Sequence, residues 1–248
     1  MPHPNYIGED PADPANYDWT RLDQVVANAT AAGTEIFVRV GNDKNEDSQG
    51  RKCDPTLTTN DPPNDYAVFA QVVKHIMMHV SDGWDNGTFV PFDYLELWNE
   101  FYHPNWWTGT GAQAVQLYKA VYAACKPSYP NTMFLPSINN WFNSNQVSHD
   151  FWNYVKDNGT VIDGVAPHLY ATHPYRIQER VYSSATDKSW EDLFADVGLP
   201  IDTPIYNAEW NRSSYNKAGK GNAVPGSTFV AASLIVMAEM HPSNGPTT

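Results

Sequence analysis

The chain has 248 residues, of which 42% are hydrophobic, and a formal net charge of −13 at pH 7. This length is typical of one large α/β domain and is enough to bury a sizeable core. The negative charge repels phosphate groups, which argues against a protein that binds nucleic acid. No apolar run approaches the ~20 residues of a transmembrane helix, so the sequence predicts no membrane partner.

Aromatic residues are abundant and make up 13% of the chain, with 9 Trp and 14 Tyr. Carbohydrate-binding proteins often use these rings as apolar platforms with a polar edge, although an ordinary core uses the same residues. The two cysteines, Cys53 and Cys125, are compatible with one disulfide or with two free thiols. The first residues lack the charged-then-apolar pattern of a signal peptide, and a secreted location is left open.

The first half of the chain alternates helices and strands. Apolar residues at helical spacing predict a helix over 20–32 that ends at Gly33, and a strand over 35–40 follows. A long polar segment separates this strand from a second helix over 65–80. A turn-rich break then leads into a strand over 94–99.

The second half repeats this alternation. The predicted elements are helices over 112–125, 149–157, 189–197 and 227–240 and strands over 133–138, 162–169 and 204–208. Strands that alternate with helices indicate βαβ units and a parallel sheet.

This pattern predicts an α/β fold of the (β/α)8 TIM barrel type, with the single partial barrel domain covering residues 1–248. Five strands are predicted, whereas the barrel closes with eight. Because the chain begins with a loop and a helix and ends with a helix, we expect a barrel fragment that lacks strands at both ends. A complete, smaller open-sheet domain is the alternative.

Two predicted strands end at a glutamate. One is Tyr94-Leu-Glu-Leu-Trp-Asn-Glu100, in which strand alternation points Glu96, Trp98 and Glu100 away from the leucines and Asn99. The other is Pro204-Ile-Tyr-Asn-Ala-Glu209-Trp210. The carboxyl ends of parallel strands are where α/β folds build their sites, so Glu100 and Glu209 are candidate catalytic residues.

Two neighbouring carboxyl groups suit the cleavage of a glycosidic bond. One protonates the leaving oxygen and the other attacks the anomeric carbon, at a separation of about 5–5.5 Å in retaining enzymes. We expect the rings of Trp98 and Phe101 to desolvate Glu100 and raise its pKa, whereas hydrogen bonds keep Glu209 ionised. Strand-end acids also serve as metal ligands in many α/β enzymes.

Several segments resemble one enzyme family. Leu97-Trp-Asn-Glu100, followed by Asn105-Trp-Trp-Thr-Gly-Thr110, resembles the acid/base region of clan A glycoside hydrolases, most of all family 39, which includes β-xylosidases and α-L-iduronidase. Ala208-Glu-Trp-Asn211 resembles the nucleophile region, and Asp163-Gly-Val-Ala-Pro-His-Leu-Tyr170 resembles the preceding strand. The chain departs from the family at Phe101, where a proline is usual.

The resemblance implies a retaining glycosidase with Glu100 as general acid/base and Glu209 as nucleophile, on about strands 3–7 of the barrel, with the first two and the last strand missing. The substrate-binding residues that we expect are Asn99, Trp107, Asn140, Trp141, His168, Tyr170 and Trp210.

The implied substrate is a β-xyloside or a related oligosaccharide or polysaccharide, and no metal or organic cofactor is expected. Two alternatives stay open. One is a carbohydrate-binding or inactive truncated relative. The other is a metal-dependent barrel hydrolase that uses Glu100, Glu209 and His168 as ligands.

Overall fold

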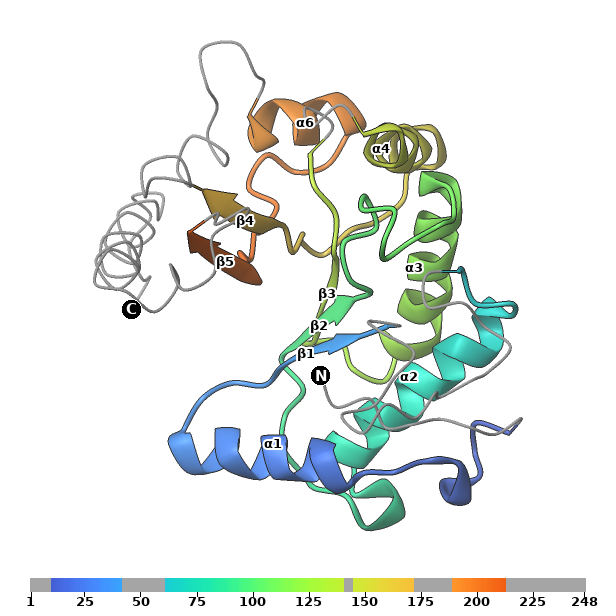
Figure 1. The fold of residues 1–248 in the computed structure, drawn as a ribbon, viewed down its shortest axis with the longest axis vertical. Coiled ribbons are helices and arrows are strands. Elements are labelled where there is room, and N and C mark those ends of the chain that lie inside the picture. The colour runs from blue at the N-terminus through green and yellow to red at the C-terminus, as the bar shows by residue number, and fades with distance from the viewer. Residues whose placement is uncertain (1–9, 42–60, 141–144, 172–188, 213–248) are drawn as a thin grey trace.

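Helices and parallel strands alternate along the chain in the computed structural model, which describes residues 10–41, 61–140, 145–171 and 189–212 (Figure 1). The described elements are η1 (Pro14–Asn16), α1 (Thr20–Ala32), β1 (Phe37–Val40), α2 (Tyr66–Ser81), η2 (Trp84–Asn86), β2 (Tyr94–Leu97), α3 (Gly111–Cys125), β3 (Met133–Pro136), α4 (Gln146–Asn158), β4 (His168–Ala171), α6 (Trp190–Val197) and β5 (Glu209–Arg212). The predicted α/β class with parallel strands is confirmed. The predicted helix over 227–240 lies outside the described residues.

Side-chain caps explain where several helices begin. The Asp65 carboxylate accepts backbone hydrogen bonds from the first turn of α2. Ser189, the predicted cap of α6, forms a capping box with Asp192. Helix α4 begins earlier than the predicted residue 149 because the side chain of Asn145 caps it.

The strands lie side by side in chain order. Strands β1, β2 and β3 form a parallel sheet, and β4 and β5 form a second parallel pair. The N–H of Ala166 donates to the carbonyl of Pro136 at 3.2 Å, so the segment before β4 adjoins the end of β3. Helices α2, α3, α4 and α6 pack against one another in succession along the strands (Figure 1).

Strands β4 and β5 begin later than predicted. The expected strands covered 162–169 and 204–208, whereas regular pairing begins at His168 and Glu209. Pro167 contributes to the late start because a proline has no N–H to donate to a ladder. Glu209 therefore opens a strand instead of following one, and that boundary prediction is wrong.

One extra residue lies in the segment that leads into β5. Val165 pairs with Ile205, and His168 pairs with Glu209. From the first pair to the second the chain advances three residues before β4 and four residues before β5, so the segment before β5 has one residue more. Such an excess is a β-bulge, a feature that re-aims side chains and is frequent beside active sites. If the first register continued, Ala208 would pair with His168.

The core lies between the strands and the helices. Leu95 and Leu97 of β2 are buried among apolar residues of α2 and α3, as the alternation predicts. Cys125, at the end of α3, is buried and carries a free thiol, whereas Cys53 lies outside the described residues. None of the helices in the described ranges is both long and apolar enough to cross a membrane.

Candidate active site

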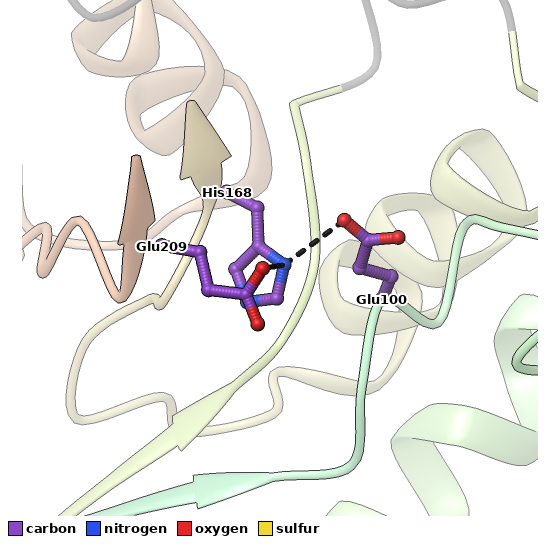
Figure 2. A group of neighbouring side chains, drawn as sticks. All are labelled: Glu100, His168 and Glu209. Atoms are coloured by element: carbon purple, nitrogen blue, oxygen red, sulfur yellow. Dashed lines mark hydrogen bonds and ion pairs between the residues drawn. The ribbon is translucent and has the colours of Figure 1, made fainter. Parts of the chain in front are cut away.

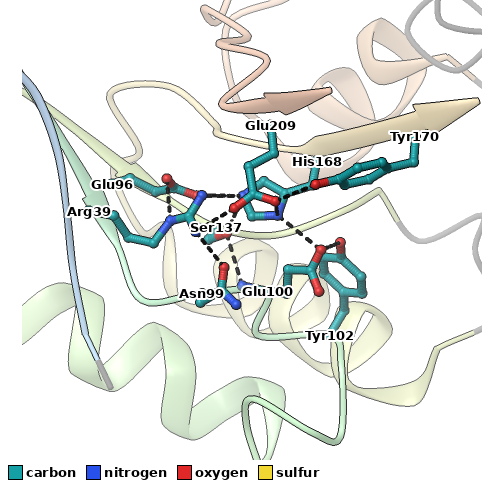
Figure 3. Close-up of polar contacts among 9 residues, drawn as sticks. All are labelled: Arg39, Glu96, Asn99, Glu100, Tyr102, Ser137, His168, Tyr170 and Glu209. Atoms are coloured by element: carbon teal, nitrogen blue, oxygen red, sulfur yellow. Dashed lines mark hydrogen bonds and ion pairs between the residues drawn. The ribbon is translucent and has the colours of Figure 1, made fainter. Parts of the chain in front are cut away.

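Charged side chains from four strands meet at one place (Figure 3). Arg39 comes from β1, Glu96 from β2, His168 from β4 and Glu209 from β5, and Glu100 follows the end of β2. The structure therefore brings the two predicted glutamates together, although 109 residues separate them in the sequence.

The Glu100 carboxylate is held through one of its oxygens. Oε1 accepts a hydrogen bond from the Tyr102 hydroxyl at 2.8 Å and lies 2.9 Å from Nδ1 of His168. The backbone N–H of Glu100 donates to Oγ of Ser137 at 3.0 Å. Within the described ranges no hydrogen bond reaches Oε2.

The Glu209 carboxylate is held through both oxygens. Oε1 lies 2.5 Å from Nη1 of Arg39. Oε2 accepts a hydrogen bond from the Tyr170 hydroxyl at 2.7 Å and lies 3.4 Å from Nδ1 of His168. Three donors from two strands, Arg39 on β1 and Tyr170 and His168 on β4, thus fix the direction of this carboxylate.

His168 lies between the two glutamates (Figure 2). One oxygen of Glu100, one oxygen of Glu209 and a ring nitrogen of His168 all lie within 4.8 Å of one another. The two carboxyl groups are therefore near enough for both to reach one small group of a substrate.

A buried carboxylate, Glu96, lies behind these groups and holds two cations. Its Oε2 accepts from Nε of Arg39 at 2.7 Å, and its Oε1 lies 2.9 Å from Nε2 of His168. Nη1 of Arg39 also donates to Oδ1 of Asn99 at 2.8 Å. Because a buried charge is stable only when it is paired, Glu96 ties the Arg39 and His168 side chains to one another.

The charge of His168 follows from these neighbours. Burial lowers its pKa, but hydrogen bonds to Glu100 and Glu96 outweigh burial and raise the pKa to about 9. At neutral pH the ring is an imidazolium that donates from both nitrogens. Nη2 of Arg39 lies 2.9 Å from Nε2, and this contact is a hydrogen bond only when the ring is neutral.

Both glutamates have a lowered pKa in the free protein. Burial raises the pKa of Glu100, yet hydrogen bonds from His168 and Tyr102 lower it by more. Burial also raises the pKa of Glu209, whereas the His168 charge and the Tyr170 hydrogen bond lower it by more. The two carboxyl groups are therefore ionised at neutral pH before a substrate binds.

The expectation that Trp98 and Phe101 raise the pKa of Glu100 is wrong. Both rings are buried in the core and pack against Trp107. Trp98 has a left-handed backbone with φ 67°, and Glu100 follows with φ 45°, so strand alternation ends after β2. The turn sends Trp98 into the core and Asn99 toward the charged cluster, the reverse of the predicted directions.

Gly41 makes this turn possible. The N–H of Trp98 donates to the carbonyl of Val40 at 2.7 Å, which draws the two chain segments together. A Cβ at Gly41 would lie 2.6 Å from Cα of Trp98, closer than real Cβ atoms approach. Gly41 also has φ 157°, at the edge of the backbone region that only glycine adopts readily.

Three of the predicted substrate-binding residues lie in the cluster. Asn99 and His168 are buried, and Tyr170 is exposed, with its hydroxyl on Glu209. Asn140 follows β3 and is partly buried.

Two of the predicted tryptophans, Trp107 and Trp210, pack with the core. Trp107 is 2% exposed and donates through its indole N–H to the carbonyl of Thr110, so it belongs to the core and the prediction of a sugar platform is wrong. Trp210 packs against the core because successive strand residues face opposite sides and its neighbour Glu209 faces the cluster. Trp141 lies outside the described residues.

Four residues of the site were not predicted from the sequence: Arg39, Glu96, Tyr102 and Ser137. Arg39 and Glu96 do carry a signal, since each is a charge inside an otherwise apolar strand, and charges are rarely buried without a partner. Tyr102 and Ser137 follow strand ends and carry no such signal.

The cluster also has the composition of a possible cation site. Glu100, His168 and Glu209 each offer one ligand atom, and these atoms lie within 4.8 Å of one another. A metal needs a neutral imidazole, so it would displace the proton that His168 now shares with Glu100. The positive charge of Arg39 beside Glu209 also opposes a second cation there.

No protein-family model and no curated protein matches this chain. A solved glucosidase from Croceicoccus marinus matches 92% of the chain at 20% identity with a TM-score of 0.72. Two structures of β-xylosidases from Caulobacter crescentus, one of them described as GH39, match 88% of it at 18% identity with TM-scores of 0.59 and 0.56.

These matches show a shared fold. The chain covers 45% of the glucosidase and 46% of each β-xylosidase, so it spans less than half the length of these proteins.

Proposed function

We propose that this chain carries the active site of a retaining glycoside hydrolase that acts on a β-xyloside or a related oligosaccharide or polysaccharide. One observation carries the proposal: two glutamates, held in different ways, place oxygens within 4.8 Å of each other. Carboxyl groups this close fit the short separation of retaining glycosidases, about 5–5.5 Å, better than the wider separation of about 6.5–9.5 Å that leaves room for a water molecule.

In the first step, Glu209 attacks the anomeric carbon while the bond to the leaving oxygen breaks. The acid form of Glu100 gives its proton to that oxygen, and a covalent glycosyl-enzyme intermediate remains. In the second step water attacks the anomeric carbon, Glu100 takes the proton of the water, and the sugar leaves Glu209. The proposed reaction uses no metal and no organic cofactor.

The first step needs a proton on Glu100, whose pKa the free protein keeps low. Binding of a sugar excludes water from the cluster, which disfavours the charged form of a carboxyl group. Glu209 is ionised and lies close to Glu100, so its negative charge opposes a second negative charge on Glu100. Glu209 itself stays charged because Arg39 and Tyr170 hold its two oxygens.

Asn99 is the proposed contact to the sugar 2-hydroxyl. Its Oδ1 already accepts from Arg39, so its amide N–H groups are the part left to meet a substrate. His168 positions both glutamates through Nδ1. Asn140, which follows β3, is proposed as a further sugar contact, and Trp141, the next residue in the sequence, is proposed as another.

We assign the five strands to strands 3–7 of a (β/α)8 barrel of the family 39 type. The chain order of the parallel strands and the fold shared with a glucosidase and β-xylosidases support this assignment. Because the chain spans less than half of those proteins, the substrate of the whole protein is proposed only as a class.

The stereochemistry of the product tests the mechanism. The full chain is incubated with xylobiose and with an aryl β-xyloside, and proton NMR records the first sugar anomer released. We expect the β-anomer from both. First release of the α-anomer would show inversion and overturn the roles given to Glu209 and Glu100.

The same samples separate the two alternatives. A metal-dependent hydrolase loses turnover in a chelator and regains it with added metal, whereas the proposed enzyme keeps its rate. A carbohydrate-binding relative retains xylooligosaccharides in a binding assay and releases no sugar. Either result would replace the proposed function.

A further inference from the structure

We propose that Tyr102 is a positioning residue that fixes which oxygen of Glu100 carries the proton of the reaction. The inference rests on the proposed function, because it gives Glu100 a proton to donate. Tyr102 lies two residues after Glu100, in the segment between β2 and α3, where no strand pattern marks it.

The geometry around Glu100 is one-sided. The Tyr102 hydroxyl and Nδ1 of His168 both point at Oε1, at 2.8 and 2.9 Å (Figure 3). Oε2 receives no hydrogen bond from the described part of the chain. The two oxygens of one carboxyl group therefore have different surroundings.

Tyr102 is held in place from several directions. Its carbonyl accepts a hydrogen bond from the side chain of Asn145, the cap of α4. The preceding residue, Phe101, is fully buried, and its N–H donates to the carbonyl of Ser137 at 3.0 Å. The backbone is therefore tied to two neighbouring elements, and the hydroxyl is held by Glu100 and by the side chain of Asn139.

The chemistry follows from the difference between a carbonyl and a hydroxyl oxygen. In a carboxylic acid the carbonyl oxygen accepts hydrogen bonds, and the other oxygen carries the proton. Two donors on Oε1 make it the accepting oxygen, so the proton lies on Oε2. In the first step the Oε2–H bond breaks toward the leaving oxygen, and in the second step Oε2 takes a proton from water.

Other charges face Glu100 as well. His168 contacts it from β4, Glu209 lies within 4.8 Å of it on β5, and His103 lies near it on its own loop. His168 is shared with Glu209 and Glu96, whereas the Tyr102 hydroxyl donates to Glu100 and has the side chain of Asn139 as its other hydrogen-bond partner. Removing this hydroxyl changes Glu100 without removing a charge from the cluster.

The test is Tyr102→Phe, measured with two substrates. Xylobiose has a poor leaving group that needs protonation, and a dinitrophenyl β-xyloside has one that leaves without it. We expect kcat/KM to fall about 10- to 100-fold on xylobiose, a part of the ~10²–10⁴-fold of full acid catalysis, and less than about 3-fold on the dinitrophenyl substrate. An equal fall on both would mean that Tyr102 only shapes the fold.

Tyr129→Phe is the matched control. The Tyr129 hydroxyl donates to Asp82 at 2.6 Å in an exposed pair away from the cluster. Both substrates should report unchanged kcat/KM for this variant. If Tyr129→Phe lowered kcat/KM as Tyr102→Phe does, the loss would follow from removing any tyrosine hydroxyl, and the specific role of Tyr102 would be refuted.

A second readout does not depend on turnover. The Glu100 carboxyl carbon is followed by NMR against pH in the wild type and in Tyr102→Phe, with Glu100→Gln for assignment. Loss of a donor to the ionised form should move the titration of Glu100 to higher pH. An unmoved titration overturns the role of Tyr102. A moved titration without sugar release from the wild type supports the contact and refutes the proposed function.

Discussion

The two glutamates of the cluster occupy different kinds of place. Glu209 lies in the ladder of β5, with Arg39 on one oxygen and Tyr170 and His168 on the other. Glu100 follows a strand in a left-handed turn and is bonded through one oxygen. Regular structure holds the first carboxylate, and a turn presents the second.

This difference matches the two tasks of a double displacement. A nucleophile gains from a fixed direction, because misplacement by about 1 Å can cost ~10²-fold in rate. An acid/base must keep one oxygen free to exchange a proton with the leaving group and then with water. The same pair of residue types thus acquires two roles from its surroundings.

The largest expected effect comes from Glu209→Gln. An amide cannot form the covalent intermediate, so we expect kcat/KM to fall about 10⁴-fold or more on both xylobiose and the dinitrophenyl β-xyloside. Glu191→Gln, an exposed change on α6, is the control. Near-normal turnover by the Glu209 variant would remove it from the role of nucleophile.

Glu100→Gln should give an uneven loss. Without an acid, kcat/KM on xylobiose falls about 10²- to 10⁴-fold, whereas the dinitrophenyl substrate, which needs no acid in the first step, falls roughly tenfold or less. Initial rates on the two substrates, measured side by side, check this. Equal losses on the two substrates would contradict the role of Glu100 as the acid.

The smallest effect is a pH dependence of stability through His168, which both glutamates share. Its pKa is about 9 in the folded protein against an ordinary 6.5, so its stabilisation is complete below about 6.5 and is lost as pH rises through about 9. We expect the free energy of unfolding in urea to fall by on the order of 2 kcal/mol over this range.

His168→Gln should flatten that dependence in the same urea titrations. The lowered pKa values of Glu100 and Glu209 affect stability in the acidic range. Their stabilisation is present above about pH 4.5 and is lost as the pH falls below that value. A wild-type curve that is level from pH 6.5 to 9 would refute a charged His168.

Much of the fold was predictable because its signals are local. Apolar runs and capping residues mark β1 to β3 and the helices, and the two glutamates stand out beside strands. The register of β5 was not predictable, since the bulge that pairs Glu209 with His168 instead of Ala208 depends on another segment. The strand pattern carries no trace of that extra residue.

The site was predictable in its acids and less so in its supporting residues. Trp107 is of a residue type that often forms sugar platforms, and only its packing in the folded protein shows that it belongs to the core. Arg39 and Glu96 are charges in apolar strands, and their pairing joins segments 57 residues apart. Sequence patterns predict what a residue is suited to do, whereas its partners are set by the tertiary fold.

Gly41 shows how far such dependence reaches. It touches neither carboxylate, yet any side chain at this position meets the backbone of Trp98, the residue that begins the turn to Glu100. Substitution at Gly41 is thus restricted by the main chain of Trp98, although Gly41 has no side chain that takes part in the reaction. In a saturation screen for activity this glycine would rank with the active-site residues, although it contributes no functional group.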